Sequence, residues 1–330
     1  MKAGKVPESV LKRSIIKQIK TKRPEILVGA SVGEDCAVVE LGEDEVYVMS
    51  TDPITGTSHE VGSLAVHVTA NDIASAGAEV IGVMLSVLLP EGTEEEELKT
   101  IMKQVEETCH ELNIQTIGGH TEVTRVVNQP VLTVTGVGKV KKGSFVTTGG
   151  AKEGDDVIVT KWVGLEGTSI IAREKEGELK KRFSPAFVEE TAGFIRYLSV
   201  VPDAAVAVRH GVTAMHDVTE GGIFGALWEV AEASGVGLKI NLKSIPIRQE
   251  TIEVCEVFGL NPYQLISSGS MLMTAGNGHD LVKKLEAEGI HATVVGKVTG
   301  GNDRVLINED EVRYLEPPKM DELYKIYTEV

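Results

Sequence analysis

The sequence is poor in cysteine and in aromatic residues, and both shortages limit what the protein can be. Its 330 residues include three cysteines, Cys36, Cys109 and Cys255. They lie far apart and form no CxxC pair, so neither a disulfide framework nor a structural zinc site is expected. Aromatic residues make up 4% of the chain, and the core must therefore be built mainly from Val, Ile, Leu and Ala.

Basic charge and long apolar runs are also scarce. Acidic residues outnumber basic ones by 49 to 33, which gives a formal net charge of −16 and argues against binding to nucleic acid. A small phosphate ligand held by backbone N–H groups or a metal ion remains compatible with this charge. No apolar run is long enough to span a bilayer, and the N-terminus lacks the pattern of a signal peptide. We therefore expect a cytoplasmic protein that binds neither nucleic acid nor membrane.

What the sequence does contain is an alternation of strand and helix patterns. In the first half, the predicted strands are 25–29, 37–41, 46–51, 81–89, IQTIGG and VLTVTGVGKV, and the predicted helices are 61–76 and 94–112. Thr93 and Glu96 have the spacing of a capping box for the second helix. Near residue 141 a Gly-, Lys- and Thr-rich stretch indicates a domain seam, after which the alternation resumes. Several strands follow one another directly, which favours mixed or antiparallel sheets.

Two polar residues stand inside the apolar stretch VTANDIASAGA. At about 100° per residue, Asn71 shares a helix face with Leu64 and Val68, and Asp72 lies on the shoulder of that face. Asp72 is also near the helix C-terminus, where the dipole disfavours a carboxylate by about 0.3–1 kcal/mol. A partly buried carboxylate there needs a partner. A metal ion, a basic side chain and hydrogen bonds from a neighbouring loop all remain open.

Three other carboxylates lie at or beside the end of a predicted strand. They are Asp35 in VGEDCAVVE, Asp52 in STDPITG and Asp217 in MHDVTEGG. Each alone is typical of a turn or a helix cap. Together they occupy the strand ends where α/β proteins usually build their sites. Hard cations such as Mg²⁺ bind such oxygens and bridge them to phosphates.

Two glycine pairs offer the complementary half of a phosphate site. Gly118 and Gly119 lie in TIGGHTEV after a strand, and Gly221 and Gly222 lie in TEGGIFGAL at the start of a helix. Glycine lets backbone N–H groups approach an anion, and a helix N-terminus favours one. Neither stretch matches GxxxxGK[ST] or GxGxxG, and each pair taken singly is better explained as a tight turn.

These stretches, in this order, resemble the aminoimidazole ribonucleotide (AIR) synthetase-like superfamily. The matching residues are GEDCAVV, TDPITG, VTANDIASAGAEV, GGHTEV and AMHDVTEGG, and the later run from DVTEGG to CEVFGLNP is most similar to the HypE-like branch. The resemblance implies an α/β (α+β) protomer with an ATP-binding, dimer-forming domain over 1–148 and a mixed-sheet domain over 149–330. It also implies a homodimer in which two N-terminal sheets pair into a barrel beside the ATP cleft.

The resemblance further implies a site for ATP and Mg²⁺. Asp35, Asp52 and Asp72 match metal–phosphate positions, and Asp72 and Asp217 are the candidate catalytic residues. The candidate cofactor-binding residues are Lys5, Asp35, Asn71, Gly118, Gly119, His120, Thr121, Glu220, Gly221 and Gly222. Family chemistry uses ATP to phosphorylate an oxygen, often of an amide-like group, and Mg²⁺ neutralises charge on the transferring phosphoryl group.

Three departures from the HypE pattern bear on the function. The chain ends DELYKIYTEV with no cysteine after Cys255, so we expect no thiocyanate to form on its own tail. His120 stands where the family usually has an acidic residue, and a neutral imidazole is a poor Mg²⁺ ligand. MKAGKVPE replaces a Gly-rich phosphate loop, and Lys5 could take over that contact.

Three functions therefore stay open. The first is a Mg²⁺-dependent, ATP-using enzyme of the HypE-like branch, related to hydrogenase maturation, which activates an oxygen of a small carboxamide- or carbamoyl-like substrate and meets a maturation partner protein. The second is a small-molecule kinase like thiamine-monophosphate kinase. The third is a nucleotide-binding dimer that assists assembly without turnover. The missing cysteine favours the third, and the retained acidic residues count against it.

Overall fold

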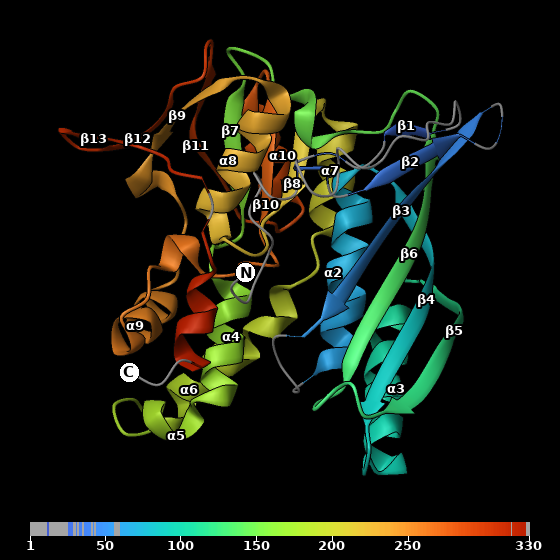
Figure 1. The fold of residues 1–330 in the computed structure, drawn as a ribbon. Helices are drawn as coiled ribbons and strands as arrows, with labels where there is room; N and C mark the ends of the chain where they lie inside the picture. The colour runs from blue at the N-terminus through green and yellow to red at the C-terminus, as the bar shows by residue number, and fades with distance from the viewer. Residues whose placement is uncertain are drawn as a thin grey trace. The chain divides into compact units, whose positions relative to one another are not determined.

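The chain forms two compact units, each with one mixed sheet (Figure 1). The computed structural model describes residues 12, 26–28, 31, 33–34, 36–40, 42, 44–55, 60–317 and 319–327. Of these, 26–28 and 36–145 belong to the first unit, and the others belong to the second. The predicted mixed α/β fold is confirmed, whereas the assignment of ATP binding and dimer formation to 1–148 stays a prediction.

The first unit is a six-stranded sheet with strand order β1-β2-β3-β6-β4-β5. Its elements are β1 (Ile26–Val28), β2 (Ala37–Glu40), β3 (Glu45–Ile54), α2 (Val61–Ser75), β4 (Glu79–Pro90), α3 (Glu95–Glu111), β5 (Gln115–Thr124) and β6 (Val131–Lys141). All neighbouring strands are antiparallel except β4 and β5. The predicted capping box of α3 is wrong, because Glu94 is the N-cap residue and the Thr93 hydroxyl donates to the Pro90 carbonyl at 2.9 Å.

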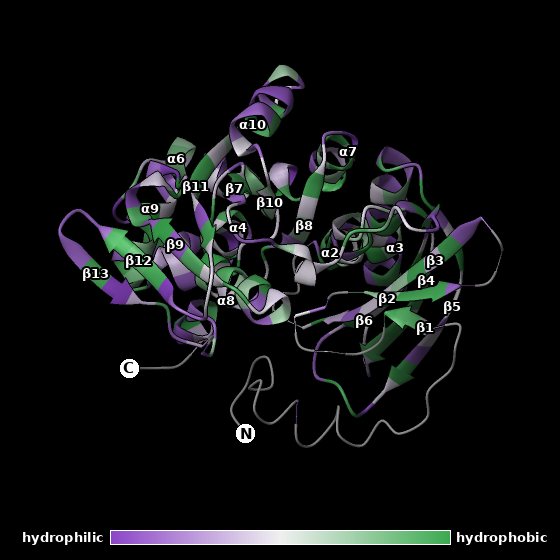
Figure 2. Cartoon of the chain, turned by 90° about the horizontal axis from the view of Figure 1, so that it is seen from above, coloured by the Kyte–Doolittle hydropathy of each residue, from purple (hydrophilic) through white to green (hydrophobic). Residues whose placement is uncertain are grey.

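Helices α2 and α3 cover one face of this sheet, and the strands show it by their alternation (Figure 2). In β3, Val46 and Val48 are fully buried toward the helices, whereas Tyr47 and Met49 are each 38% exposed on the other side. The register places Val137 opposite Met49 and Thr135 opposite Met84, which is 46% exposed. We call this side the open face and define it by Tyr47, Met49, Met84, Thr135 and Val137.

The second unit is a seven-stranded sheet with strand order β13-β12-β9-β11-β7-β10-β8. Its strands are β7 (Asp156–Thr160), β8 (Val212–Asp217), β9 (Gly237–Asn241), β10 (Met271–Ala275), β11 (Ala292–Thr299), β12 (Arg304–Asn308) and β13 (Glu311–Tyr314). Its helices are α4 (Leu165–Glu174), α5 (Glu176–Leu179), α6 (Pro185–Ala192), α7 (Val201–Arg209), α8 (Gly222–Ser234), α9 (Gln249–Phe258) and α10 (Gly278–Ala287), with 3-10 turns η2 (Thr148–Gly150), η3 (Gly193–Tyr197), η4 (Leu242–Ser244), η5 (Pro262–Gln264) and η6 (Glu322–Tyr327).

Two hydrophobic clusters contribute to the core of the second unit. One lies between α8 and the sheet and includes Val157, Leu227 and Leu272. The other gathers α4, α6 and α9 with the C-terminal residues Leu323 and Ile326. In the described part of the chain, no single helix is long and apolar enough to cross a membrane. The bent pair Pro185–Tyr197 and Val201–Arg209 reaches that length and apolar character when its two helices are taken together.

Helix α2 packs closely on β6 because β6 has a glycine beneath it. A Cβ atom at Gly136 would lie 2.5 Å from Ile73 Cδ1 and 2.6 Å from Thr69 Cγ2. Both side chains belong to residues that are fully buried, so little space exists for them to move into. The glycine therefore sets how near the helix comes to the strand, and with it the position of Asp72 on the same helix.

We expect Gly136→Ala to lower the free energy of unfolding by about 1–3 kcal/mol, because the added methyl group overpacks the contact with α2. Denaturant unfolding measures the change. Gly177→Ala in α5 is the matched control, since a Cβ atom there meets nothing within 4 Å and should be neutral or slightly stabilising. Equal stabilities of the two variants would contradict the packing argument.

Candidate functional site

Two of the predicted carboxylates meet at one serine in the first unit. Ser50 Oγ lies 2.5 Å from Asp72 Oδ2 and 3.3 Å from Asp52 Oδ2. Alternation along β3 turns Ser50 and Asp52 toward the face covered by α2, which carries Asp72. A hydroxyl has one proton and can donate it to one carboxylate at a time. The arrangement therefore brings two carboxylates to one serine hydroxyl.

The last turn of α2 is held by further hydrogen bonds. Cys36 Sγ donates to the Asp72 carbonyl oxygen at 3.0 Å, and Ser75 Oγ donates to the same oxygen at 2.6 Å. Asn71 is fully buried and Asp72 is 6% exposed, which confirms that the pair faces the packed side. Sequence reasoning did not identify Ser50 or Cys36 as residues that orient Asp72, although both flank predicted acidic positions in the motifs.

The carboxylate oxygens of Asp52 and Asp72 suit Mg²⁺ in a site that water and substrate phosphates complete. Among the residues that the structure describes, no group of three or more His, Cys, Asp or Glu side chains is arranged to hold a metal. Mg²⁺ is commonly bound by one or two carboxylates together with water and substrate phosphates. Two hard carboxylates at one point match that mode rather than a closed protein cage. Asp35 and Lys5 lie outside the described residues, and their roles stay predictions.

The stretch from Gly118 to Thr121 is part of a strand, which confirms the predicted strand IQTIGG and shows that the glycine pair does not form a tight turn. It lies in β5, parallel to β4, with Leu85 opposite Gly119 and Ser86 opposite His120. A Cβ atom at Gly119 would overlap the Leu85 carbonyl oxygen, which explains the glycine without a ligand. Because neighbouring strand residues point to opposite faces, His120 lies on the side of Ser86, away from the face that carries Asp52 and Asp72.

The β8–α8 turn in the second unit also has a backbone reason for its glycines. Gly221 and Gly222 have φ values of 92° and 61°, which favour glycine. A Cβ atom at Gly222 would lie 2.7 Å from the Tyr263 carbonyl oxygen. The N–H of Gly221 donates to Asp321 Oδ2 at 2.6 Å. The predicted contact of this turn with a cofactor stays a prediction, as do the roles of Asp217 and Glu220.

Buried acids surround that turn. Burial raises the pKa of Glu166 to about 7, and repulsion from Asp321 and Glu220 adds to the increase. Burial likewise raises the pKa of Asp321 to about 6, against the stabilising effect of its backbone hydrogen bonds. Glu166 Oε2 accepts from the Ser268 N–H at 3.2 Å, across 102 residues of sequence. Sequence reasoning missed both acids, since no local pattern marks partners so distant.

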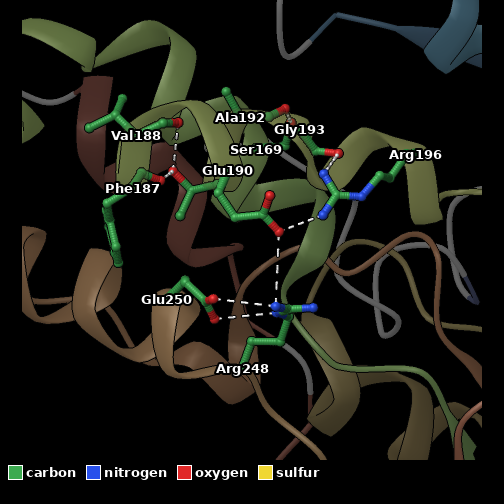
Figure 3. A network of polar contacts seen from close by, with 10 residues as sticks. Ser169, Phe187, Val188, Glu190, Ala192, Gly193, Arg196, Arg248 and Glu250 are labelled. Atoms are coloured by element: carbon green, nitrogen blue, oxygen red, sulfur yellow. Dashed lines mark hydrogen bonds and ion pairs between the residues drawn. The ribbon is translucent and has the colours of Figure 1, made fainter. Parts of the chain in front are cut away.

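The arginines on another side of this unit form a balanced network rather than an anion site (Figure 3). Arg196 Nη2 lies 2.5 Å from Glu190 Oε1, and Arg248 Nη2 lies 4.0 Å from the same oxygen. Arg248 also pairs with Glu250 at 3.3 Å. Each guanidinium is thus matched by a carboxylate, and the network stabilises the contact between α6, η3 and the start of α9.

Both halves of the chain match models of one protein family. The N-terminal domain of AIR synthase related protein matches residues 33–140, and the C-terminal domain of the same family matches residues 152–308. The chain belongs to this family. Its order of domains and its motifs agree with the resemblance stated from sequence, and its relatives are HypE-like.

Two relatives illustrate the similarity in sequence. A protein of Methanocaldococcus jannaschii named for hydrogenase expression/formation is 29% identical over 320 residues, which cover 92% of this chain and 91% of that protein. The carbamoyl dehydratase HypE of Cupriavidus necator is 29% identical over 269 residues, or 76% of this chain and 74% of that protein.

Solved structures extend the similarity to the fold. The crystal structure of a HypE–HypF complex matches with a TM-score of 0.78 and 20% identity, covering 94% of this chain and 100% of that one. A HypE structure in complex with ATP matches with a TM-score of 0.73 and 19% identity, covering 97% of each chain. AaThiL complexed with AMPPCP and TMP matches with a TM-score of 0.73 and 22% identity, covering 93% of this chain and 96% of that one.

The raised pKa of the buried Glu166 side chain predicts how the stability of Glu166→Gln compares with that of wild type at different pH values. Because the folded-state pKa of Glu166 is about 7, well above the ordinary value of about 4.3, wild-type stability falls as pH rises through this window. Glutamine keeps an acceptor for the Ser268 N–H and carries no charge. At pH 8 the variant should therefore exceed wild type in free energy of unfolding by on the order of 2 kcal/mol, and at pH 5 by little.

Thermal and denaturant unfolding at the two pH values measure this difference. Glu256→Gln, at an exposed position of α9, is the matched control and should show no gain that grows with pH. A Glu166→Gln effect of the same size at pH 5 and pH 8 would show that the carboxylate is not held at a raised pKa.

Proposed function

We propose that this protein is a Mg²⁺-dependent, ATP-using member of the HypE-like branch that acts in hydrogenase maturation. The observation that carries the proposal is the convergence of Asp52 and Asp72 on Ser50 at 3.3 and 2.5 Å. A relative named carbamoyl dehydratase supports a carboxamide- or carbamoyl-like substrate whose oxygen is activated. The HypE structure in complex with ATP supports the nucleotide.

In this proposal the first unit prepares the phosphoryl-transfer end of the site. Asp52 and Asp72 would hold Mg²⁺, which when bound would neutralise charge on the transferring phosphoryl group. Ser50 orients the Asp72 carboxylate, while the thiol of Cys36 and the hydroxyl of Ser75 fix the backbone behind it. Such prior placement reduces the reorganisation needed when charge develops in the transition state.

The two alternatives have less support. The likeness to a thiamine-monophosphate kinase structure rests on the fold at 22% identity. A nucleotide-binding assembly factor without turnover would have little need for two carboxylates held at one point by a buried serine. The HypE–HypF complex supports a maturation partner protein for this chain, in addition to its small-molecule substrate.

A homodimer through the open face completes the proposal, with two such sheets forming a barrel. The open face carries Tyr47, Met49 and Met84, each between 38% and 46% exposed in one protomer. Strand β5 is also exposed along almost its entire length, and an uncovered edge strand favours pairing with another chain. A second copy would cover both features, since a two-fold interface uses the same patch on each subunit.

The metal role is tested by Asp72→Ala. We expect the affinity for Mg·ATP to fall at least about tenfold, the equivalent of about 1.4 kcal/mol, because one of two carboxylate ligands is lost while the dimer persists. Isothermal titration calorimetry with and without Mg²⁺ measures the affinity. Asp44→Ala, at an exposed site of the same unit, is the control and should bind as wild type does. Unchanged affinity in Asp72→Ala would remove the metal role, and wild-type protein that fails to bind Mg·ATP would refute the function.

The dimer is tested by Met84→Lys. Because Met84 is 46% exposed in one protomer, the substitution should leave the protomer folded, but it would bury an ammonium group in each copy of the interface, at a cost of several kcal/mol. Sedimentation analysis should therefore show monomers at concentrations where wild type is dimeric. Val312→Lys, at a 62% exposed position of β13, should not change the oligomeric state. A dimeric Met84→Lys protein would place the interface elsewhere.

A further inference from the structure

The C-terminal segment Asp321–Tyr327, which we call the strap, is built into the second unit. Leu323 is 3% exposed and Ile326 is 8% exposed, and both belong to the cluster formed with α4, α6 and α9. Figure 1 shows its 3-10 turn, in red, beside α4. Burial of these two aliphatic side chains removes their apolar surface from water and stabilises the folded position of the strap. The strap is therefore packed as part of the core of this unit.

Asp321, the first residue of the strap, joins two loops through its carboxylate. Oδ2 accepts from the Gly221 N–H at 2.6 Å, and Oδ1 accepts from the Ile266 N–H at 3.2 Å and from the Leu323 N–H at 2.8 Å. Asp321 is 1% exposed, and these bonds compensate for removing its charge from water. The loop that precedes β10 and the turn that precedes α8 are thus held to one side chain.

Glu322, the next residue of the strap, connects it to a third segment of the unit, at Asn261. Glu322 Oε2 accepts from the Asn261 N–H at 2.9 Å and from Lys325 Nζ at 2.6 Å. The β8–α8 turn is tied from its other side as well, because the Val218 N–H donates to the Ser270 carbonyl at 3.0 Å. The turn that carries Glu220 is consequently fixed by the strap and by the segment before β10.

The carboxylate of Asp321 also affects what the start of α8 can bind. The N-terminal end of a helix carries a partial positive charge and usually favours an anion. At α8, the carboxylate of Asp321 already occupies the N–H of Gly221. Glu220 adds negative charge nearby, since it raises the pKa of both Glu166 and Asp321. A phosphate group would meet a filled N–H and repulsion here.

We propose that Asp321 is a positioning residue: it serves as the internal anion of the α8 N-terminus and fixes the β8–α8 turn that presents Asp217 and Glu220. The role in turnover rests on the function proposed above. The β8–α8 turn is then a rigid acidic turn whose Gly221 N–H is not offered to a phosphate group.

The experiment compares Asp321→Ala with Asp156→Ala in the full-length protein. Asp156 makes the same kind of bond, accepting from the Gly278 N–H at 2.9 Å at the N-terminal end of α10, so its loss controls for removing a buried helix-end carboxylate. We expect Asp321→Ala to speed amide hydrogen exchange of Gly221–Ile223 by about tenfold or more, because an unmade buried hydrogen bond exposes the turn to opening. Added formate, a small carboxylate that can take the place of the lost side chain, should restore the protection of these amides in Asp321→Ala and should have no such effect in Asp156→Ala.

Kinetics distinguish positioning from a general loss of stability. With Asp321→Ala, kcat for ATP turnover should fall about tenfold while the Kd for Mg·ATP stays within about twofold, and Asp156→Ala should change neither. If Asp321→Ala does not fold, Asp321→Asn replaces it in these measurements, since the amide oxygen of Asn can still accept a hydrogen bond whereas its NH₂ group cannot. Unchanged exchange at Gly221–Ile223, or unchanged kcat despite faster exchange, would overturn the proposal. Absence of Mg·ATP binding by wild type would refute the proposed function, and the exchange comparison would still decide the structural role of Asp321.

Discussion

The first unit depends on one constraint, which is that the carboxylate of Asp72 is buried in the last turn of α2. That position lies near the negative end of the helix dipole, and Asp72 is 6% exposed. Ser50 donates one hydrogen bond, yet the same hydroxyl also faces Asp52. A cation bound between the two carboxylates would favour the charged form of both. The packing of α2 on Gly136 matters for the same reason, because it sets where the carboxylate stands.

The second unit solves the opposite problem with its own side chains. Its helix N-termini present N–H groups that need acceptors, and Asp321 and Asp156 provide them from distant parts of the sequence. The cost is visible in the raised pKa of Asp321, since burial outweighs its hydrogen bonds. The two units therefore differ in what they offer a ligand: the first brings together acceptor oxygens that suit a cation, whereas the second already uses the Gly221 N–H at the start of α8.

The local sequence pattern predicted those features of the fold that depend on residues close together in the chain. Helical periodicity placed Asn71 and Asp72 on the packed face of α2, and the end of a strand pattern marked Asp52. The strand was nonetheless expected to end at residue 51, while β3 continues through Pro53 to Ile54, because its antiparallel pairing with β6 extends that far. Strand β10 was not predicted, since a fully buried run of five residues is too short to be told from a buried helix segment by its pattern. Its neighbours β7 and β8 determine it, and they lie far away in sequence.

The glycine pairs show why a glycine pattern alone does not identify a phosphate site. Three of the four glycines are required by the backbone: Gly119 by the nearby carbonyl of Leu85, and Gly221 and Gly222 by positive φ values, with the approach of Tyr263 at Gly222. A glycine pair at a helix start signals an available N–H only when no side chain of the same protein accepts from it. At α8 that condition fails, because Asp321 arrives from 100 residues further along the chain. One N–H of this pattern is thus already used by an internal hydrogen bond, and the strongest argument for nucleotide binding rests on the carboxylates around Ser50.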